Sequence, residues 1–159
     1  MSKIKKTNAM RILDQKKVSY NVLTYDKGDG KIDGISVAEK IDRNLEVVYK
    51  TLVAQGNSKN IYVFVIPVAE ELDLKKAAKV SGEKKIEMIP VKEILKLTGY
   101  IRGGCSPVGM KKSYKTFIDS SASRIEKIIV SAGRIGVQIE FEVRKLIEVI
   151  EAELANVVK

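Results

Sequence analysis

Two runs of strand-forming residues around a Gly-Asn-Ser turn constrain the fold of this chain more than any other feature. Residues 46–54 and 61–67 are rich in Val, Ile, Tyr and Phe, and Gly56-Asn57-Ser58 lies between them. The second run contains the longest uninterrupted apolar stretch, residues 61–66, far short of the about 20 residues that a membrane-spanning helix needs. The pattern therefore predicts a β-hairpin inside a soluble globular protein.

Helices and strands are expected to mix irregularly along the rest of the chain. Apolar spacing and capping residues, with Ser36 and Asp73 as expected N-caps, predict helices over residues 8–17, 36–41, 74–80, 90–97 and 142–157. Further strands are predicted over residues 18–25, 116–119, 127–131 and 135–141. Because hairpins fall at both ends and the βαβ spacing is irregular, the pattern favours a mixed-sheet α+β fold over a doubly wound one.

The chain length predicts one domain spanning residues 1–159. A chain of about 150 residues buries close to 70% of its unfolded surface, so it needs no disulfide or structural metal. The single cysteine excludes an internal disulfide, and residues 1–6 lack the apolar core of a signal peptide. A cytoplasmic location is expected.

The absence of histidine excludes several kinds of catalytic site. No Ser-His-Asp or Cys-His arrangement, histidine base or imidazole zinc site is possible in this chain. The sequence also offers no ligand cluster for a metal or redox cofactor. We expect no cofactor.

Positive charge is concentrated in the middle third of the chain. The formal net charge is +9, and residues 74–116 carry 11 Lys and Arg against 3 Asp and Glu, which gives 11 − 3 = +8. Such a segment predicts one basic face that would attract RNA or DNA. A solvated lysine surface without a partner explains the charge equally well.

A glycine-rich loop is predicted over residues 98–110, where five of thirteen residues are Gly or Pro. Its adjacent glycines would let main-chain groups approach a ligand closely, and the flanking Arg102, Lys111 and Lys112 could hold phosphates. The spacing is not that of a Walker A loop. On pattern alone, a plain tight turn remains as good an interpretation.

Two further side chains are candidates for chemistry. Lys50 lies inside an apolar strand, where burying its charge is unfavourable unless the side chain faces a cavity or a partner. Alternatively, the alternation of side chains along the strand puts Lys50 on the solvent-exposed face. Cys105, in the glycine-rich loop, could be a nucleophile. Without a histidine to activate it, a packed bystander thiol is the better interpretation.

Six segments form an ordered set along almost the whole chain: residues 24–26, 49–53, 73–79, 98–112, 118–119 and 130–136. The most specific are Tyr-Lys-Thr-Leu-Val at 49–53 and the loop that reads Thr-Gly-Tyr-Ile-Arg-Gly-Gly-Cys-Ser-Pro from residue 98. This set resembles the YbaK/EbsC family, which includes bacterial Cys-tRNA(Pro) deacylases and the editing domain inserted in many prolyl-tRNA synthetases.

The resemblance implies a mixed β-barrel-like sheet flanked by helices and a trans-editing activity. Such an enzyme hydrolyses the ester of mischarged Cys-tRNA(Pro), with Cys-tRNA(Cys) as a second substrate, and the substrate's own thiol attacks its carbonyl. The expected partners are the 3′ end of aminoacyl-tRNA and, as a candidate, prolyl-tRNA synthetase. Carried over by position, the catalytic groups would be Lys50 and Gly103; the substrate-binding residues Tyr25, Thr51, Gly104, Ser106, Pro107 and Gln138; and the tRNA-binding residues Arg102, Lys111 and Lys112.

Three positions depart from the pattern that this resemblance implies. Asp33 stands where many members have an aromatic residue, Gln138 where some have Asp, and Asn8 where many have Pro. Each could change which aminoacyl group is accepted. An Ala-tRNA(Pro) deacylase and a non-catalytic module that binds tRNA or a synthetase therefore remain as alternatives.

Overall fold

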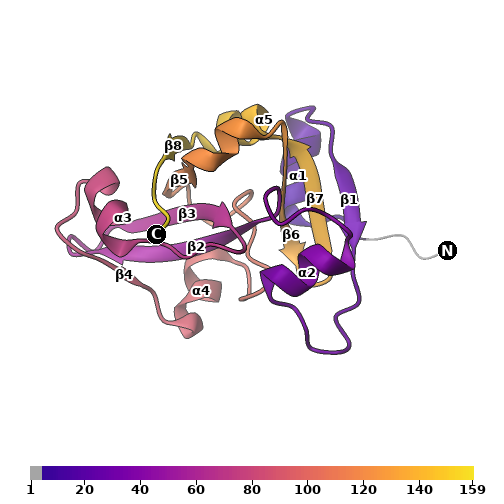
Figure 1. The fold of residues 1–159 in the computed structure, drawn as a ribbon, viewed down its shortest axis with the longest axis horizontal. Helices are drawn as coiled ribbons and strands as arrows, with labels where there is room; N and C mark the ends of the chain where they lie inside the picture. The colour runs from indigo at the N-terminus through magenta and orange to yellow at the C-terminus, as the bar shows by residue number, and fades with distance from the viewer. Residues whose placement is uncertain (1–4) are drawn as a thin grey trace.

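The predicted hairpin lies at the centre of the larger of two sheets (Figure 1). In the computed structural model, which describes residues 5–159, β2 (Tyr49–Gly56) pairs antiparallel with β3 (Ile61–Pro67). The sheet has the order β4-β2-β3-β5-β8, and β4 (Ile86–Met88) is antiparallel to β2. On the other side, β5 (Lys115–Asp119) runs parallel to β3, and β8 (Glu153–Ala155) runs parallel to β5. Residues 1–4, part of the segment used to argue against a signal peptide, lie outside the described residues.

The second sheet is antiparallel and has three strands in the order β1-β7-β6. These are β1 (Asn21–Thr24), β7 (Val137–Glu142) and β6 (Lys127–Arg134). A parallel bridge between Val48 and Ile129 connects the start of β2 with β6. The predicted α+β class with a mixed sheet is confirmed, with the strands divided between two sheets.

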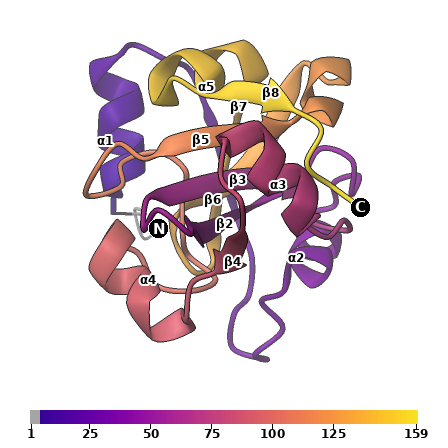
Figure 2. The same cartoon turned by 90° about the vertical axis from the view of Figure 1, so that its left-hand side faces the viewer.

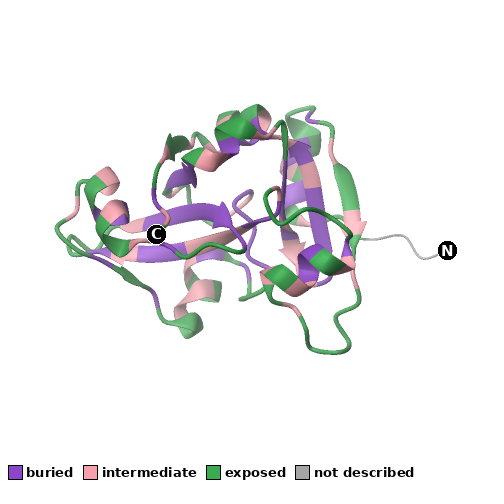
Figure 3. Ribbon diagram, in the orientation of Figure 1, coloured by how far each residue is buried: buried purple, intermediate pink, exposed green. Residues whose placement is uncertain are grey.

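Helices cover both sheets (Figures 1 and 2). Side chains of α1 (Asn8–Gln15) and α5 (Val143–Ile150) share a buried cluster with β6 and β7. The larger sheet carries α3 (Leu74–Ser81) and α4 (Val91–Thr98), and α2 (Gly34–Lys40) packs near Val48 and Ile129. Figure 3 shows buried strands beneath helices whose outer faces are exposed. Within residues 5–159, no helix is long and apolar enough to cross a membrane.

The hairpin buries different side chains on its two faces, because successive residues of a strand point in opposite directions. Ala54, Tyr62 and Phe64 join the cluster that contains α3, and Phe64 stacks on Phe117 with ring centroids 5.6 Å apart. Val53 and Ile61 join the cluster that contains α4. The helices α3 and α4, with their lysines, therefore pack on opposite faces of the sheet. The expectation of one basic face stays a prediction.

The predicted C-terminal helix over residues 142–157 is wrong beyond Ile150. Glu151 adopts a left-handed conformation (φ 50°), which ends α5, and residues 153–155 form β8 along the exposed edge of β5. Leu154 continues the helical spacing of apolar residues, but pairing with β5 takes precedence over that local pattern.

Three local boundaries also differ from the predictions. Asp33, not Ser36, caps α2, since its Oδ2 accepts the Ser36 N–H at 3.1 Å. β6 continues through Ala132, Gly133 and Arg134 with an irregular register, so the β6–β7 turn is at residues 135–136. β4 was not predicted, because three residues carry too little periodicity.

Candidate functional site

A cleft of about 670 Å³ opens where the two sheets meet. Its walls come from the start of β2, the β1–α2 loop with the start of α2, the glycine-rich loop, and the facing strands β6 and β7. The lining residues are Tyr25, Gly30, Ile32, Asp33, Gly34, Val37, Val48, Tyr49, Lys50, Thr51, Leu52, Val68, Arg102, Gly103, Cys105, Ser131 and Gln138. Six predicted site residues are among them: Tyr25, Lys50, Thr51, Arg102, Gly103 and Gln138.

The cleft follows a free edge of β2. On that side β4 pairs only with residues 54–56 and β6 reaches β2 only through the bridge at Val48, so the middle of β2, around Thr51, has no strand partner there. Val53 C=O accepts the Ile89 N–H at 3.3 Å, which shows that the main chain of Val53 faces this edge. Because main-chain groups of alternate residues point to the same side of an antiparallel strand, the N–H and C=O of Thr51 face it too.

Two buried hydroxyl groups in the cleft wall have no hydrogen-bond partner in the described part of the chain. They are Tyr25 Oη and Thr51 Oγ1. Leaving a buried polar group unsatisfied costs about 1–3 kcal/mol, so such groups call for a specific explanation. Both belong to residues that line one cleft, which makes a polar ligand bound there a candidate partner for them.

Lys50 brings a positive charge to the cleft. Its side chain is half-buried, and none of the ion pairs within residues 5–159 involves it. Of the two interpretations of Lys50 in the sequence, a lysine at a cavity and a lysine on a solvent-exposed strand face, the structure supports the first.

The other two predicted polar residues of the cleft differ in exposure. Gln138 is only 6% exposed and lies opposite Ser131 in the β6–β7 pair, whereas Arg102 is exposed.

The two adjacent glycines of the loop face different neighbours. Gly103, with φ at +86°, lines the cleft, and a Cβ there would lie 3.1 Å from Ile32 Cδ1. Gly104 packs on the β6–β7 turn instead, since a Cβ there would lie 3.0 Å from the Ile135 nitrogen. Only a glycine allows this close main-chain approach. Gly103 therefore presents its main chain to the cleft, while Gly104 holds the loop against the second sheet.

Buried side chains order the rest of the loop, as predicted. Tyr100 Oη donates to Val108 C=O at 2.7 Å, and the Ser106 hydroxyl accepts the Val108 N–H at 3.2 Å. Ser106 and Pro107 are buried and do not line the cleft. Lys111 and Lys112 are exposed and also lie outside its wall.

The cleft wall has no evident protein nucleophile or base. Burial raises the pKa of the Cys105 thiol to about 11, so the thiolate is scarce at neutral pH. Asp33 accepts hydrogen bonds from the hydroxyl and N–H of Ser36, and the hydroxyl contact is the main cause that lowers the pKa of this carboxyl. The Lys50 ammonium group and the main chain of the cleft wall can bind, orient and stabilise developing charge, which suits a ligand that supplies its own nucleophile.

Sequence reasoning did not assign a site role to several residues of the cleft wall. Ser131 lies in one of the segments that carry the resemblance, which was a usable signal. Gly30 and Ile32 belong to a loop without periodicity, so only the path of the chain places them at the cleft. Asp33, which the sequence already marks as a departure from the family pattern, lines the same wall.

Comparison with known proteins is consistent with this geometry. A family model of the aminoacyl-tRNA editing domain matches residues 35–149. A curated protein of Enterococcus faecalis (strain ATCC 700802 / V583), named "Putative Cys-tRNA(Pro)/Cys-tRNA(Cys) deacylase EbsC", is 43% identical over 152 residues, which cover 96% of this chain and 93% of the relative.

Two solved structures share the fold at lower sequence identity. A "putative trans-editing enzyme for prolyl tRNA synthetase" superposes with a TM-score of 0.85 at 19% identity, over 96% of this chain and 95% of that one. The "hypothetical protein APE2540" superposes with a TM-score of 0.87 at 22% identity, over 96% and 100%. From the family match and the 43% identical relative, this chain belongs to the aminoacyl-tRNA editing domain family.

Proposed function

We propose that this protein is a trans-editing deacylase that hydrolyses the ester between a mischarged amino acid and the 3′-terminal adenosine of tRNA, with Cys-tRNA(Pro) as its main substrate. The observation that carries the proposal is the convergence of Lys50, the main chain of Gly103 and two unpartnered hydroxyls on one cleft, in a chain of the editing family. The name of the Enterococcus relative supports cysteine as the amino acid.

The proposed reaction uses the substrate's own thiol. The cysteinyl sulfur attacks the ester carbonyl, a carbon–sulfur bond forms, and the carbon–oxygen bond to the ribose breaks. The thiol proton passes to the departing ribose oxygen, which leaves a tRNA with a free terminal hydroxyl and a cysteine thiolactone that water then opens. No protein nucleophile is needed, which suits a cleft without histidine and with a protonated Cys105.

The protein would act by positioning and by electrostatic stabilisation. Lys50 would attract the negative charge that develops on the carbonyl oxygen, and the main chain of Gly103 would orient the aminoacyl end. The hydroxyls of Tyr25 and Thr51, with the amide of Gln138, would bind the amino acid or the terminal ribose. Arg102, Lys111 and Lys112 would contact tRNA phosphates, since all three are exposed.

The biological setting follows from this substrate. We propose that residues 1–159 work as one editing domain in the cytoplasm and receive mischarged tRNA released by prolyl-tRNA synthetase.

Three residues expected to bind substrate take a supporting role in this proposal. Gly104, Ser106 and Pro107 would hold the glycine-rich loop in place instead of touching the aminoacyl group, because they do not line the cleft.

The test is amino-acid release from Cys-tRNA(Pro), Cys-tRNA(Cys), Ala-tRNA(Pro) and Pro-tRNA(Pro) by wild type, Lys50→Ala and Lys79→Ala. We expect fast release of cysteine, retention of proline, and a fall in kcat on the order of a hundredfold for Lys50→Ala, since removing one stabilising group from a developing oxyanion has effects of that size. Lys79→Ala removes the same charge from the exposed surface of α3 and should match wild type.

Each other result has a definite meaning. Preferred release of alanine, which has no thiol, would contradict the thiol-assisted step and indicate an Ala-tRNA(Pro) deacylase that uses water. Binding of tRNA without hydrolysis of any ester would indicate a non-catalytic module. Hydrolysis by folded Lys50→Ala at the wild-type rate would remove Lys50 from the mechanism.

A further inference from the structure

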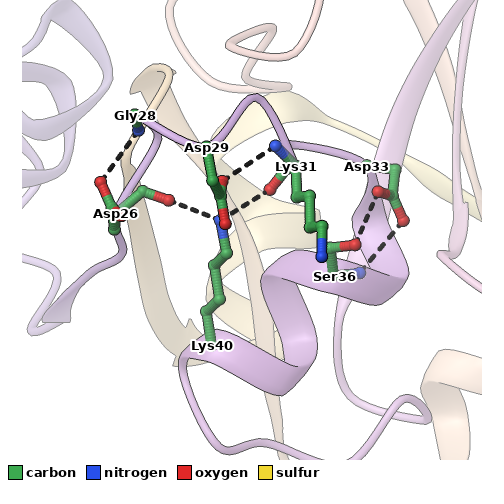
Figure 4. Close-up of polar contacts among 7 residues, drawn as sticks. All are labelled: Asp26, Gly28, Asp29, Lys31, Asp33, Ser36 and Lys40. Atoms are coloured by element: carbon green, nitrogen blue, oxygen red, sulfur yellow. Dashed lines mark hydrogen bonds and ion pairs between the residues drawn. The ribbon is translucent and has the colours of Figure 1, made fainter.

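The ammonium group of Lys40, at the end of α2, lies among oxygen atoms of the loop that precedes this helix (Figure 4). Its Nζ donates to Asp26 C=O at 2.6 Å, to Asp29 Oδ1 at 2.7 Å and to Lys31 C=O at 2.9 Å. An ammonium group has three donors, so all of its hydrogen-bonding capacity is used on this one loop. The side chain is only 20% exposed, which limits competition from water.

These contacts join the outgoing and returning limbs of the loop. Asp26 follows β1 closely and Lys31 is near the start of α2, so one cation connects both ends of the segment. The Asp29 carboxylate accepts the Lys31 N–H at 3.0 Å as well, and the hydrogen bond from Lys40 is the main cause that lowers the pKa of this carboxyl. Without the cation, two carbonyl oxygens and the Asp29 carboxylate would converge, and the Lys31 N–H would satisfy only Asp29.

Lys40 also lies over the ring of Tyr25, with Nζ 5.8 Å from the ring centroid. This is within the range of a cation–π contact. Tyr25 carries one of the two unpartnered hydroxyls in the cleft wall. The position of that hydroxyl is thus coupled to the same ammonium group that holds the loop.

The loop in turn forms one wall of the cleft. Gly30, Ile32 and Asp33 line it, and Ile32 Cδ1 meets Gly103, whose main chain faces the cleft from the other side. Lys40 itself does not line the cleft. Any effect of this lysine on a bound ligand therefore passes through Tyr25 and the loop.

We propose that Lys40 is a positioning residue: it holds Tyr25 and residues 26–33 in place as the wall that determines how tightly the aminoacyl end fits the cleft. The kinetic part of this proposal rests on the proposed deacylase function. A loop without its clamp would admit larger aminoacyl groups and hold the correct one less well, whereas Lys50 and Gly103 would stay where they are.

The test compares Lys40→Met, which keeps the length of the side chain but loses its donors, with Lys40→Arg and with Lys31→Met. Lys31 is a matched control, because it is an exposed lysine of the same loop whose ammonium group does not take part in the clamp. We expect Lys40→Met to raise KM for Cys-tRNA(Pro) on the order of tenfold, leave kcat within about twofold, and weaken discrimination against Pro-tRNA(Pro). Lys40→Arg should recover part of the loss, and Lys31→Met should match wild type.

Amide hydrogen exchange of residues 25–33 gives a readout that does not depend on catalysis. Exchange there should become faster in Lys40→Met and stay unchanged in Lys31→Met. Wild-type KM and discrimination in Lys40→Met would overturn the positioning role. If wild type hydrolyses none of the esters, the deacylase proposal fails, and unchanged exchange in Lys40→Met would then overturn the clamp independently.

Discussion

Burial decides the chemistry of individual side chains around the cleft. Cys105 packs in a cluster with Val53 and Tyr100, and burial raises the pKa of its thiol to about 11 and that of the Tyr100 hydroxyl to about 12. Both groups therefore stay neutral at physiological pH. The preferred sequence interpretation of Cys105, a packed bystander thiol, is confirmed by its burial.

Cys105→Ala should retain deacylation within about twofold, because a protonated, buried thiol has no part in a substrate-assisted reaction. The change leaves a small cavity, so the free energy of unfolding should fall by about 1 kcal/mol. Aminoacyl-tRNA hydrolysis and urea unfolding measure the two effects. Loss of activity in a folded variant would instead assign the thiol to the reaction.

Elements far apart in the sequence are joined by single polar side chains. Glu83 follows the end of α3 and accepts hydrogen bonds from the Ser58 N–H and hydroxyl and from Tyr62 Oη. It thereby connects the turn of the β2–β3 hairpin to α3. These donors, the Ser58 hydroxyl first, lower the pKa of the Glu83 carboxyl below its ordinary value of 4.5.

This contact predicts a pH-dependent contribution to stability. A carboxyl whose pKa is lower in the folded state stabilises the fold above its unfolded pKa, and the contribution is lost as the pH falls through the folded value. Glu83→Gln should lower Tm at neutral pH, and the difference from wild type should shrink at about pH 3. Thermal unfolding at both pH values tests this, with exposed Glu70→Gln as control. A difference that is the same at both pH values would contradict it.

Across the whole molecule, the lysines of residues 74–116 belong to elements on both faces of the larger sheet. Lys75 and Lys79 lie on α3, while Lys111 and Lys112 follow α4 on the glycine-rich loop that also supplies Arg102 and Gly103 to the cleft. The larger sheet separates α3 from α4. An aminoacyl-tRNA whose 3′ end enters the cleft would thus meet the loop lysines and not those of α3.

Two double variants with equal loss of charge test this division. Lys111→Ala/Lys112→Ala should weaken tRNA binding and reduce the slope of log K against log salt concentration by roughly 1.5 to 2, the value for two lost phosphate contacts. Lys75→Ala/Lys79→Ala should leave both quantities near wild type. Filter binding across a salt series measures both quantities. Equal effects of the two variants would show that tRNA binding depends on total charge and not on which surface carries it.

Some features of this protein follow from local sequence alone. The β2–β3 hairpin, the Asp73 cap of α3 and the ordered glycine-rich loop depend on residues close together in the chain, so composition and spacing predict them. The placement of Lys50 in a strand next to a cavity was one of two interpretations of the same pattern, and the structure decides between them.

Other features depend on contacts between distant segments, which no local pattern encodes. The end of α5 at Glu151 follows from pairing of residues 153–155 with β5, and the separation of Gly103 from Gly104 follows from the approach of the β6–β7 turn. The clamp by Lys40 exists only because α2 folds back on the loop before it. The sequence by itself determined most of the elements, and its family pattern supplied most of the polar residues of the cleft. The tertiary structure decided where β4 and β8 form and which residues share the cleft, because packing and pairing across the chain outweigh local propensity.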